Sequence, residues 1–278
     1  MIVDTHVHVV SPDRTRYPLQ PAKDLDWVYK HPVTAEQLIV EMKEGGVARA
    51  VLVQAISAHG YDNSLVADTA ALYPALFSAV CSLSVIQPGA DDRLSYWVEE
   101  RGVNGLRLFN AVSPEDAWLD DPRTFAVLER ASRLKVPVTM VTRHGDIGRV
   151  ERVLERFHDI QFALDHLGHL PSEEKPPYIC SPEFFALARY PNLSVKFSAV
   201  NQWAAGRGPV PVRDYFKAIV EAFGPRRIMW GSNYPPTRFR SYPGLAAMGA
   251  EAFDFLPEEQ RDWIMGENAL RHWPPAGV

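Results

Sequence analysis

The fold of this chain is indicated by its first strand-and-helix pair, which reads IVDTHVHV at residues 2–9 and TAEQLIVEMKEGG at residues 34–46. The first stretch is rich in β-branched residues and predicts a strand. In the second stretch Thr34 is a candidate N-cap for an amphipathic helix, and the glycine pair predicts the end of that helix. A strand followed by a helix is the unit from which parallel α/β folds are built.

The same unit recurs to the end of the chain. We predict strands at residues 2–9, 48–55, 76–83, 105–110, 136–142, 160–166, 193–198 and 227–232. We predict helices at residues 34–46, 62–73, 90–101, 121–134, 147–157, 181–190, 212–223 and 243–254, and a closing helix at 257–271. Eight consecutive strand–helix units predict an α/β fold with one domain, a (β/α)8 TIM barrel over residues 1–278.

Composition and charge narrow the function classes. The chain has 278 residues, of which 46% are hydrophobic and 23% charged, so a sizeable core is expected. The net charge of −5 and the lack of a basic run argue against nucleic acid as a partner. Neither export nor a membrane span is predicted, because the first residues show no basic or apolar leader pattern and no stretch of 18 apolar residues occurs. Cys81 and Cys180 form no CxxC pair, which predicts reduced, buried thiols in a cytoplasmic protein.

Three connections that follow strands are long and rich in Pro, Gly or aromatic residues. They span residues 9–33, 167–180 and 199–211, whereas the connections from helices back to strands are short. The loops after the strands form the functional face of such barrels, so we expect a small-molecule substrate there.

Two histidines lie two residues apart in the first strand. Side chains alternate along a strand, so Asp4, His6 and His8 are predicted to share one face. A single histidine at such a position would be interpreted as an interior residue whose ring nitrogens are hydrogen-bonded. A same-face pair instead favours a shared cation or anion, and a divalent metal is the commonest partner.

Other candidate groups follow the sixth and eighth predicted strands. DHLGH at residues 165–169 supplies His166, while His169 beyond it needs no role. GSNYPP at residues 231–236 ends the eighth strand. Histidines from the first and sixth strands that meet at one rim are typical of a metal site.

With these motifs in place, the chain resembles the amidohydrolase superfamily. The similarity is to the branch that includes 2-pyrone-4,6-dicarboxylate lactonase and sugar lactonases, and more distantly to zinc-dependent decarboxylases. It covers nearly the whole chain, through HVH at 6–8, VLVQ at 51–54, GLRLFN at 105–110, LDHLGH at 164–169, VKFS at 195–198, IMWGSNYPP at 228–236 and GENALRHW at 266–273.

The resemblance implies that His6, His8 and His166 are metal ligands and catalytic residues. It also places Asn233 where the family usually has an aspartate that binds metal or takes a proton from water. An amide cannot accept that proton near neutral pH. His144, Asp146 and Asp165 are the alternative bases, and the asparagine is either natural in this branch or engineered.

The binuclear members of the family have a lysine or glutamate on the fourth strand, where this chain has Arg107. We therefore expect one divalent metal, with zinc as the first choice, or operation without metal. In the second case the same histidines and arginines would hold the substrate.

Several residues at or just past strand ends are predicted to bind the substrate. Arg107 shares a strand face with Gly105, which would leave room for a ligand, although a solvated surface cation is the alternative for Arg107 and for Arg143. Three other cations are interpreted as surface residues: Lys196, Arg238 and Arg240. The remaining candidates are Gln54, Arg143, His144 and Tyr234; a buried structural amide and aromatic packing are the alternatives for Gln54 and Tyr234.

Together these features predict a hydrolase that opens a lactone or a related carboxyl ester of an anionic small molecule. Water attacks the carbonyl, which is polarised by a metal or by His166 and Arg107. The alternatives are a metal-dependent decarboxylase of the same superfamily, or a barrel that binds a ligand without turnover because Asn233 has replaced its base. The sequence leaves a homo-oligomer open.

Overall fold

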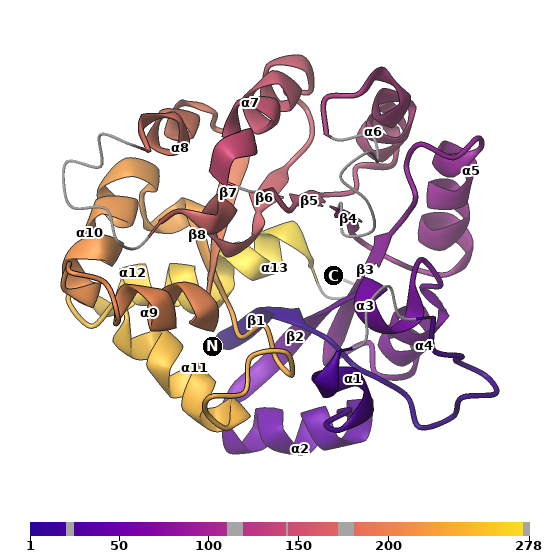
Figure 1. Ribbon diagram of the computed structural model, residues 1–278, viewed down its shortest axis with the longest axis horizontal. Coiled ribbons are helices and arrows are strands. Elements are labelled where there is room, and N and C mark those ends of the chain that lie inside the picture. Colours follow the sequence, from indigo (N-terminus) through magenta and orange to yellow (C-terminus); the bar gives the residue numbers. More distant parts are fainter. Residues whose placement is uncertain (21–24, 110–118, 143, 172–180, 275–278) are drawn as a thin grey trace.

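The protein is a barrel of parallel strands surrounded by helices, as the sequence predicts (Figure 1). The computed structural model describes residues 1–20, 25–109, 119–142, 144–171 and 181–274. The eight strands follow one another in chain order around the sheet. They are β1 (Ile2–Val7), β2 (Val47–Val53), β3 (Phe77–Ser82), β4 (Leu106–Leu108), β5 (Val138–Met140), β6 (Phe162–Leu164), β7 (Leu193–Ser198) and β8 (Ile228–Gly231). A parallel bridge between Val7 and Tyr234 joins the first strand to the chain after the last.

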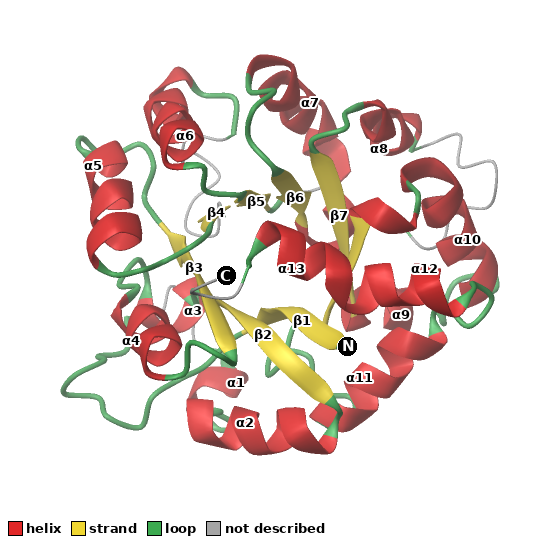
Figure 2. Ribbon diagram, turned by 180° about the vertical axis from the view of Figure 1, so that it is seen from behind, coloured by secondary structure: helices red, strands yellow, loops and turns green. Residues whose placement is uncertain are grey.

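Helices cover the outside of the barrel in both views (Figures 1 and 2). Those in the predicted positions are α2 (Ala35–Glu44), α4 (Ser64–Leu72), α5 (Ala90–Ser95) with η1 (Tyr96–Glu100), α6 (Pro122–Leu134), α7 (Ile147–Arg156), α8 (Pro182–Ala186) with η4 (Leu187–Arg189), α10 (Val212–Phe223), α11 (Tyr242–Glu251), and the closing α12 (Glu258–Asp262), η6 (Trp263–Glu267) and α13 (Asn268–His272). Short helices not predicted from the sequence are α1 (Asp26–Tyr29), α3 (Ile56–His59), η2 (His144–Asp146), η3 (Asp165–His169), α9 (Ala199–Ala205) and η5 (Pro225–Arg227).

Two of the three hydrophobic clusters among the described residues follow from the alternation of side chains along each strand. In β2, Ala50 and Leu52 pack into the large cluster between strands and helices. Val51 and Val53 of the same strand belong to a separate cluster inside the barrel, together with Trp273. The interior is therefore filled with side chains, as in other barrels of this class.

The stretch predicted as a long loop at 199–211 begins with a helix instead. Ser198 and Asn201 form a reciprocal cap at the start of α9, with Ser198 N donating to Asn201 Oδ1 at 2.9 Å. This capping pair was not recognised in the sequence. It matters below because both residues reach the site.

Two further sequence expectations concern cysteines and membranes. Cys81 is a buried free thiol, as predicted, whereas Cys180 lies outside the described residues. Among the residues described, none of the helices has the length and apolar character needed to cross a bilayer. The cytoplasmic location remains a prediction.

Candidate active site

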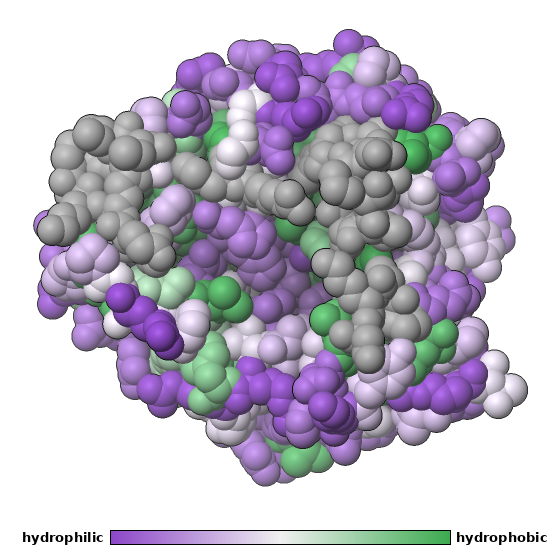
Figure 3. All heavy atoms as spheres, viewed as in Figure 1, coloured by the Kyte–Doolittle hydropathy of each residue, from purple (hydrophilic) through white to green (hydrophobic). Residues whose placement is uncertain are grey.

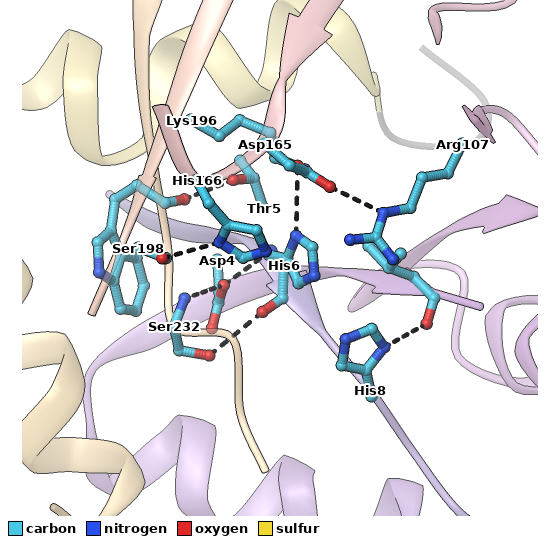
Figure 4. Close-up of polar contacts among 12 residues, drawn as sticks. Asp4, Thr5, His6, His8, Arg107, Asp165, His166, Lys196, Ser198 and Ser232 are labelled. Carbon is cyan, nitrogen blue, oxygen red and sulfur yellow. Dashed lines mark hydrogen bonds and ion pairs between the residues drawn. The ribbon is translucent and has the colours of Figure 1, made fainter. Parts of the chain in front are cut away.

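Three histidine side chains gather where β1 and β6 end, at the carboxyl face of the barrel (Figure 4). His6 lies in β1, His8 follows that strand, and His166 lies in the turn after β6. The ring centroid of His6 is 5.0 Å from that of His8 and 4.9 Å from that of His166. In the same view as Figure 1, the middle of the molecule is hollowed and shows hydrophilic residues (Figure 3). The structure thus brings together the three histidines singled out in the sequence.

The turn after β6 has a left-handed backbone over four residues. The φ angles of His166, Leu167, Gly168 and His169 are 54°, 52°, 58° and 54°. This conformation costs roughly 1–2 kcal/mol for each residue with a side chain. A Cβ on Gly168 would also lie 2.8 Å from Ile147 Cδ1. Strain of this kind is kept where the surrounding structure enforces it, commonly at functional sites.

Hydrogen bonds hold His8 and His166 in one tautomer each. His8 Nδ1 donates to the Val53 carbonyl at 2.8 Å, since a carbonyl can only accept. The Ser198 hydroxyl lies 3.1 Å from Asn201 Oδ1, to which it donates, and 2.9 Å from His166 Nδ1, from which it accepts. Both rings therefore carry their proton on Nδ1 and keep a free lone pair on Nε2.

His6 is held from behind by a buried carboxylate. Its Nδ1 lies 3.4 Å from Asp165 Oδ1, while Arg107 Nε donates to Oδ2 at 2.8 Å. The ammonium of Lys196 lies 3.0 Å from Oδ1. Because a carboxylate accepts the proton of Nδ1, the lone pair of His6 lies on Nε2. That atom is buried and has no hydrogen-bond partner among the described residues.

The charge states of these groups follow from their burial. Burial lowers the pKa of His6 well below its ordinary value, that of His8 to about 4 and that of His166 to about 3. For Asp165, burial alone would raise the pKa, but the charges of Lys196 and Arg107, together with the hydrogen bond to His6, outweigh it and hold the pKa well below the usual range. The site therefore combines three neutral imidazoles with one ionised carboxylate.

These residues fit a divalent cation. Candidate ligand atoms of His6, Asp165 and His166 lie within 4.8 Å of one another. Each imidazole also has its Nδ1 bonded to a carbonyl, a hydroxyl or a carboxylate, which is typical of metal-binding histidines. Both oxygens of Asp165 already face cations, so this carboxylate is better suited to orienting His6 than to binding the metal. His8 lies beside this set rather than within it.

The end of β8 and the chain after it lie against His6 and add only a neutral side chain to the site. Asn233 has a left-handed φ of 55°, and its backbone N–H donates to the His6 carbonyl at 2.9 Å. Its side-chain Nδ2 donates to Thr237 Oγ1 at 3.0 Å. Gly231 lies against His6 so closely that a Cβ would be 2.7 Å from His6 Cβ. This segment fixes the position of His6 without adding a charge.

The residues predicted to bind the substrate are placed as follows. Gln54 is fully buried and donates from Nε2 to the carbonyls of Gly60 and Asp62 at 2.9 and 2.8 Å, the structural alternative considered above. The Tyr234 hydroxyl donates to Glu41 Oε1 at 3.0 Å, away from the histidines. Arg107 is 5% exposed and lies close enough to His8 to lower the pKa of that ring further.

Two predicted residues cannot be assessed in this way. Arg143 lies outside the described residues, and His144 lies in η2 but its side chain is not described. Their predicted roles remain predictions.

Three local interpretations were wrong. Lys196 is 2% exposed rather than a surface cation, because it pairs with Asp165 inside the barrel, whereas Arg238 and Arg240 are exposed as expected. The space beside Gly105 is filled by Trp273, whose Nε1 would lie 2.7 Å from an added Cβ.

The third concerns Asp4, which does not share the orientation of His6. Its carboxylate accepts from Ser232 N at 2.9 Å and from the Tyr242 hydroxyl of α11 at 3.1 Å. The pairing of β1 with β2 shifts in register between Asp4 and Val7, which breaks the simple alternation of side chains.

Sequence reasoning missed the supporting residues Lys196, Ser198 and Asn201, and gave Asp165 only as one alternative base. A signal was present in the alternation of β7, since Lys196 and Ser198 fall on one face of a strand whose six residues are all buried.

The fold and this centre define a class, that of (β/α)8 enzymes with a histidine-rich site at the carboxyl ends of the strands. Residues 3–274 match the amidohydrolase family, and the chain belongs to that family. It is an enzyme of the amidohydrolase superfamily, which confirms the prediction from the motifs.

Named relatives support the lactonase-like branch. The chain is 24% identical to the L-fucono-1,5-lactonase of Burkholderia ambifaria, over 98% of this chain and 94% of the relative. A putative 2-pyrone-4,6-dicarboxylic acid hydrolase of Pseudomonas putida has a TM-score of 0.80 and 19% identity, with 98% and 96% of the two chains covered. An amidohydrolase of Burkholderia multivorans with bound zinc has a TM-score of 0.78 and 20% identity, with 98% of each chain covered. At these identities the solved structures show a shared fold.

Proposed function

We propose that this protein hydrolyses the lactone of a small, carboxylate-bearing molecule. The observation that carries the proposal is the set of three neutral imidazoles, His6, His8 and His166, whose Nε2 atoms make no hydrogen bond to the described residues and which lie beside Arg107 and Asp165. The named lactonase among the relatives supports a lactone as the substrate.

Each residue has a separate role in this proposal. The imidazoles of His6 and His166 would hold one divalent cation, with His8 beside them as the third predicted ligand, and zinc is the first choice because neutral imidazole nitrogens suit it. When bound, that ion would polarise the lactone carbonyl and make water more acidic. Asp165 orients His6 by accepting from its Nδ1, and Arg107 supplies a buried positive charge for the carboxylate of the substrate.

The residue that takes the proton from water is not Asn233, because an amide is too weak a base. Asp165 is a poor choice as well, since its neighbouring cations hold its pKa well below the usual range. Asp146 is another candidate base, and its Oδ1 accepts a hydrogen bond from Arg149 Nε at 3.2 Å at the start of α7. His144 lies in η2 with Asp146 and is the remaining candidate, because an imidazole is a base near neutral pH.

The test is kcat/KM over a panel of sugar lactones and carboxylate-bearing lactones, with metal content measured on the same samples by mass spectrometry. We expect turnover of at least one lactone, and loss of that turnover when both His6→Ala and His8→Ala are introduced. Circular dichroism would show that the double variant is folded, because the packing lies below these residues inside the barrel.

The other results of this test would favour other functions or contradict a role of the histidine pair. A folded double variant that keeps its activity contradicts a catalytic role for the pair. Release of carbon dioxide from a carboxylate substrate, without lactone hydrolysis, favours the decarboxylase alternative. Tight binding of lactones without any turnover favours the inactivated barrel. Full activity after chelation and removal of metal favours the metal-free alternative with the same residues.

A further inference from the structure

Lys196 is a buried cation that the proposed reaction does not use. It lies in β7 inside the barrel, is 2% exposed, and is among the largest fully buried side chains of the described residues. Lysine is almost never fully buried unless it is paired, and burial lowers its pKa here. Burying such a charge is unfavourable unless a partner compensates the loss of hydration. A hydrophobic residue would fill this position at lower cost, so a role beyond packing is indicated.

The partners of Lys196 lie on two sides of it. On one side its Nζ is 3.0 Å from Asp165 Oδ1, and the two groups form a buried ion pair. On the other side Nζ lies 5.1 Å from the centroid of the Trp273 ring, within the range of a cation–π contact. The ammonium is therefore held between the carboxylate behind His6 and an indole.

The indole is fixed by the closing stretch of the chain, residues 266–273. Asn268 Nδ2 donates to the Ile228 carbonyl at the start of β8 at 2.8 Å, and His272 Nε2 lies 3.1 Å from Ser194 Oγ in β7. Seen from behind, α13 crosses the end of the barrel opposite the histidines (Figure 2). Trp273 follows α13 and lies against Gly105. The closing stretch thus forms a floor for Lys196.

The contacts then lead from Lys196 to His6. Asp165 Oδ1 faces both Lys196 at 3.0 Å and His6 Nδ1 at 3.4 Å, while Arg107 takes Oδ2 at 2.8 Å (Figure 4). The contact with His6 is the longest of the three. The two cations, rather than the imidazole, therefore set the direction in which the carboxylate points.

We propose that Lys196, held on the indole of Trp273, is a positioning residue that fixes the Asp165 carboxylate so that His6 keeps its proton on Nδ1 and its lone pair on Nε2. The inference rests on the proposed function only because that function makes His6 a metal ligand. Its geometry does not depend on which substrate is hydrolysed.

The test reads the tautomer of His6 directly, in protein that has been stripped of metal. Long-range proton–nitrogen spectra of 15N-labelled protein report which ring nitrogen carries the proton, and His6→Ala identifies the signals of His6. We expect wild type to show one tautomer, Nδ1–H. In Lys196→Met the two nitrogen shifts should move toward each other, because the carboxylate is no longer held on that side. Lys196→Arg restores a cation and should return the shifts toward wild type.

A second readout is the affinity for Zn²⁺, measured by competition with a chromophoric chelator. Loss of a group that orients a ligand typically weakens metal binding by about 10- to 100-fold, and we expect Lys196→Met to fall in that range. The effect should vanish in an Asp165→Asn background, since Lys196 acts through that carboxylate. The control is Lys217→Met, which removes an exposed lysine of α10 that pairs with Glu221 at 3.9 Å; neither readout should change.

Folded Lys196→Met with wild-type shifts for His6 and wild-type affinity for Zn²⁺ would overturn the proposal and leave Lys196 a structural residue. If that variant does not fold, Lys196→Gln keeps a polar tip without the charge, and the same two outcomes decide. The proposed function fails separately, if no lactone is hydrolysed, because the nitrogen shifts are measured without substrate.

Discussion

The turns after β6 and β8 both reach His6, and they contribute opposite things to the site. The β6 turn supplies Asp165, which is ionised and faces cations, and His166, whose tautomer is set by Ser198. The end of β8 supplies Gly231, which leaves room for His6, and the turn after it supplies Asn233, which is neutral. One turn therefore sets the charge of the centre and the other sets its shape. Substitutions in the two turns should separate these contributions.

The largest effect is expected at the charged turn. In Asp165→Asn the two buried cations Arg107 and Lys196 lose their counter-charge, and removal of one partner from a buried ion pair costs about 3–5 kcal/mol. Urea unfolding should show a drop in the free energy of unfolding of this size. Activity should also be lost, because His6 loses the acceptor for its Nδ1 proton.

Asp146→Asn is the matched control for that change. Asp146 pairs with Arg149 at a partly exposed position, where ion pairs contribute about 0–1 kcal/mol. If the two substitutions lower the free energy of unfolding equally, the buried charge cluster contributes no more to stability than an exposed ion pair.

A smaller loss is expected at the shape-setting turn. In Gly231→Ala the new Cβ meets His6 Cβ at 2.7 Å, so either β1 or β8 must shift. Overpacking of this kind costs about 1–3 kcal/mol, and a displacement of about 1 Å at a catalytic group can reduce the rate by about 10²-fold. Thermal unfolding and kcat/KM measure the two effects.

Gly148→Ala provides the comparison for Gly231→Ala. Gly148 lies in α7, and among the described residues the nearest atom to an added Cβ is the flexible end of Arg152 at 3.7 Å. Alanine in a helix is favoured over glycine by about 0.5–1 kcal/mol, so stability should rise and activity should stay level. Wild-type activity in Gly231→Ala would show that His6 tolerates displacement.

The contrast between the two turns also explains what the sequence could reveal. Strand ends, the barrel and the meeting of His6 with His166 follow from local periodicity and from the equivalence of strand ends in a barrel. The burial of Lys196 does not, because a lysine in a strand is an ordinary surface residue until its partner Asp165 is known to lie across the barrel.

The contact of Trp273 with Gly105 could not be predicted either, since the two residues are distant in sequence and meet only in the folded barrel. The use of the Tyr234 hydroxyl by Glu41 could not be foreseen either. Long-range pairs of this type carry no local pattern, so they escape a reading of the sequence alone.

The smallest effect on stability, and the sharpest test of the comparison, is expected for Asn233→Asp. Aspartate tolerates the left-handed backbone at this position about as well as asparagine does, so the free energy of unfolding should change by less than about 0.5 kcal/mol. If the β8 turn has lost a water-activating carboxylate, restoring it should raise kcat/KM for a lactone by about 10²–10⁴-fold, the usual contribution of a positioned base. It should also tighten the binding of a divalent metal by adding an anionic ligand. Asn233→Gly, which keeps the backbone conformation but offers no side chain, should show neither gain. If Asn233→Asp gives no gain on any lactone that wild type hydrolyses, then the neutral amide belongs to a working site, and the charge that the site needs is already supplied by the β6 turn.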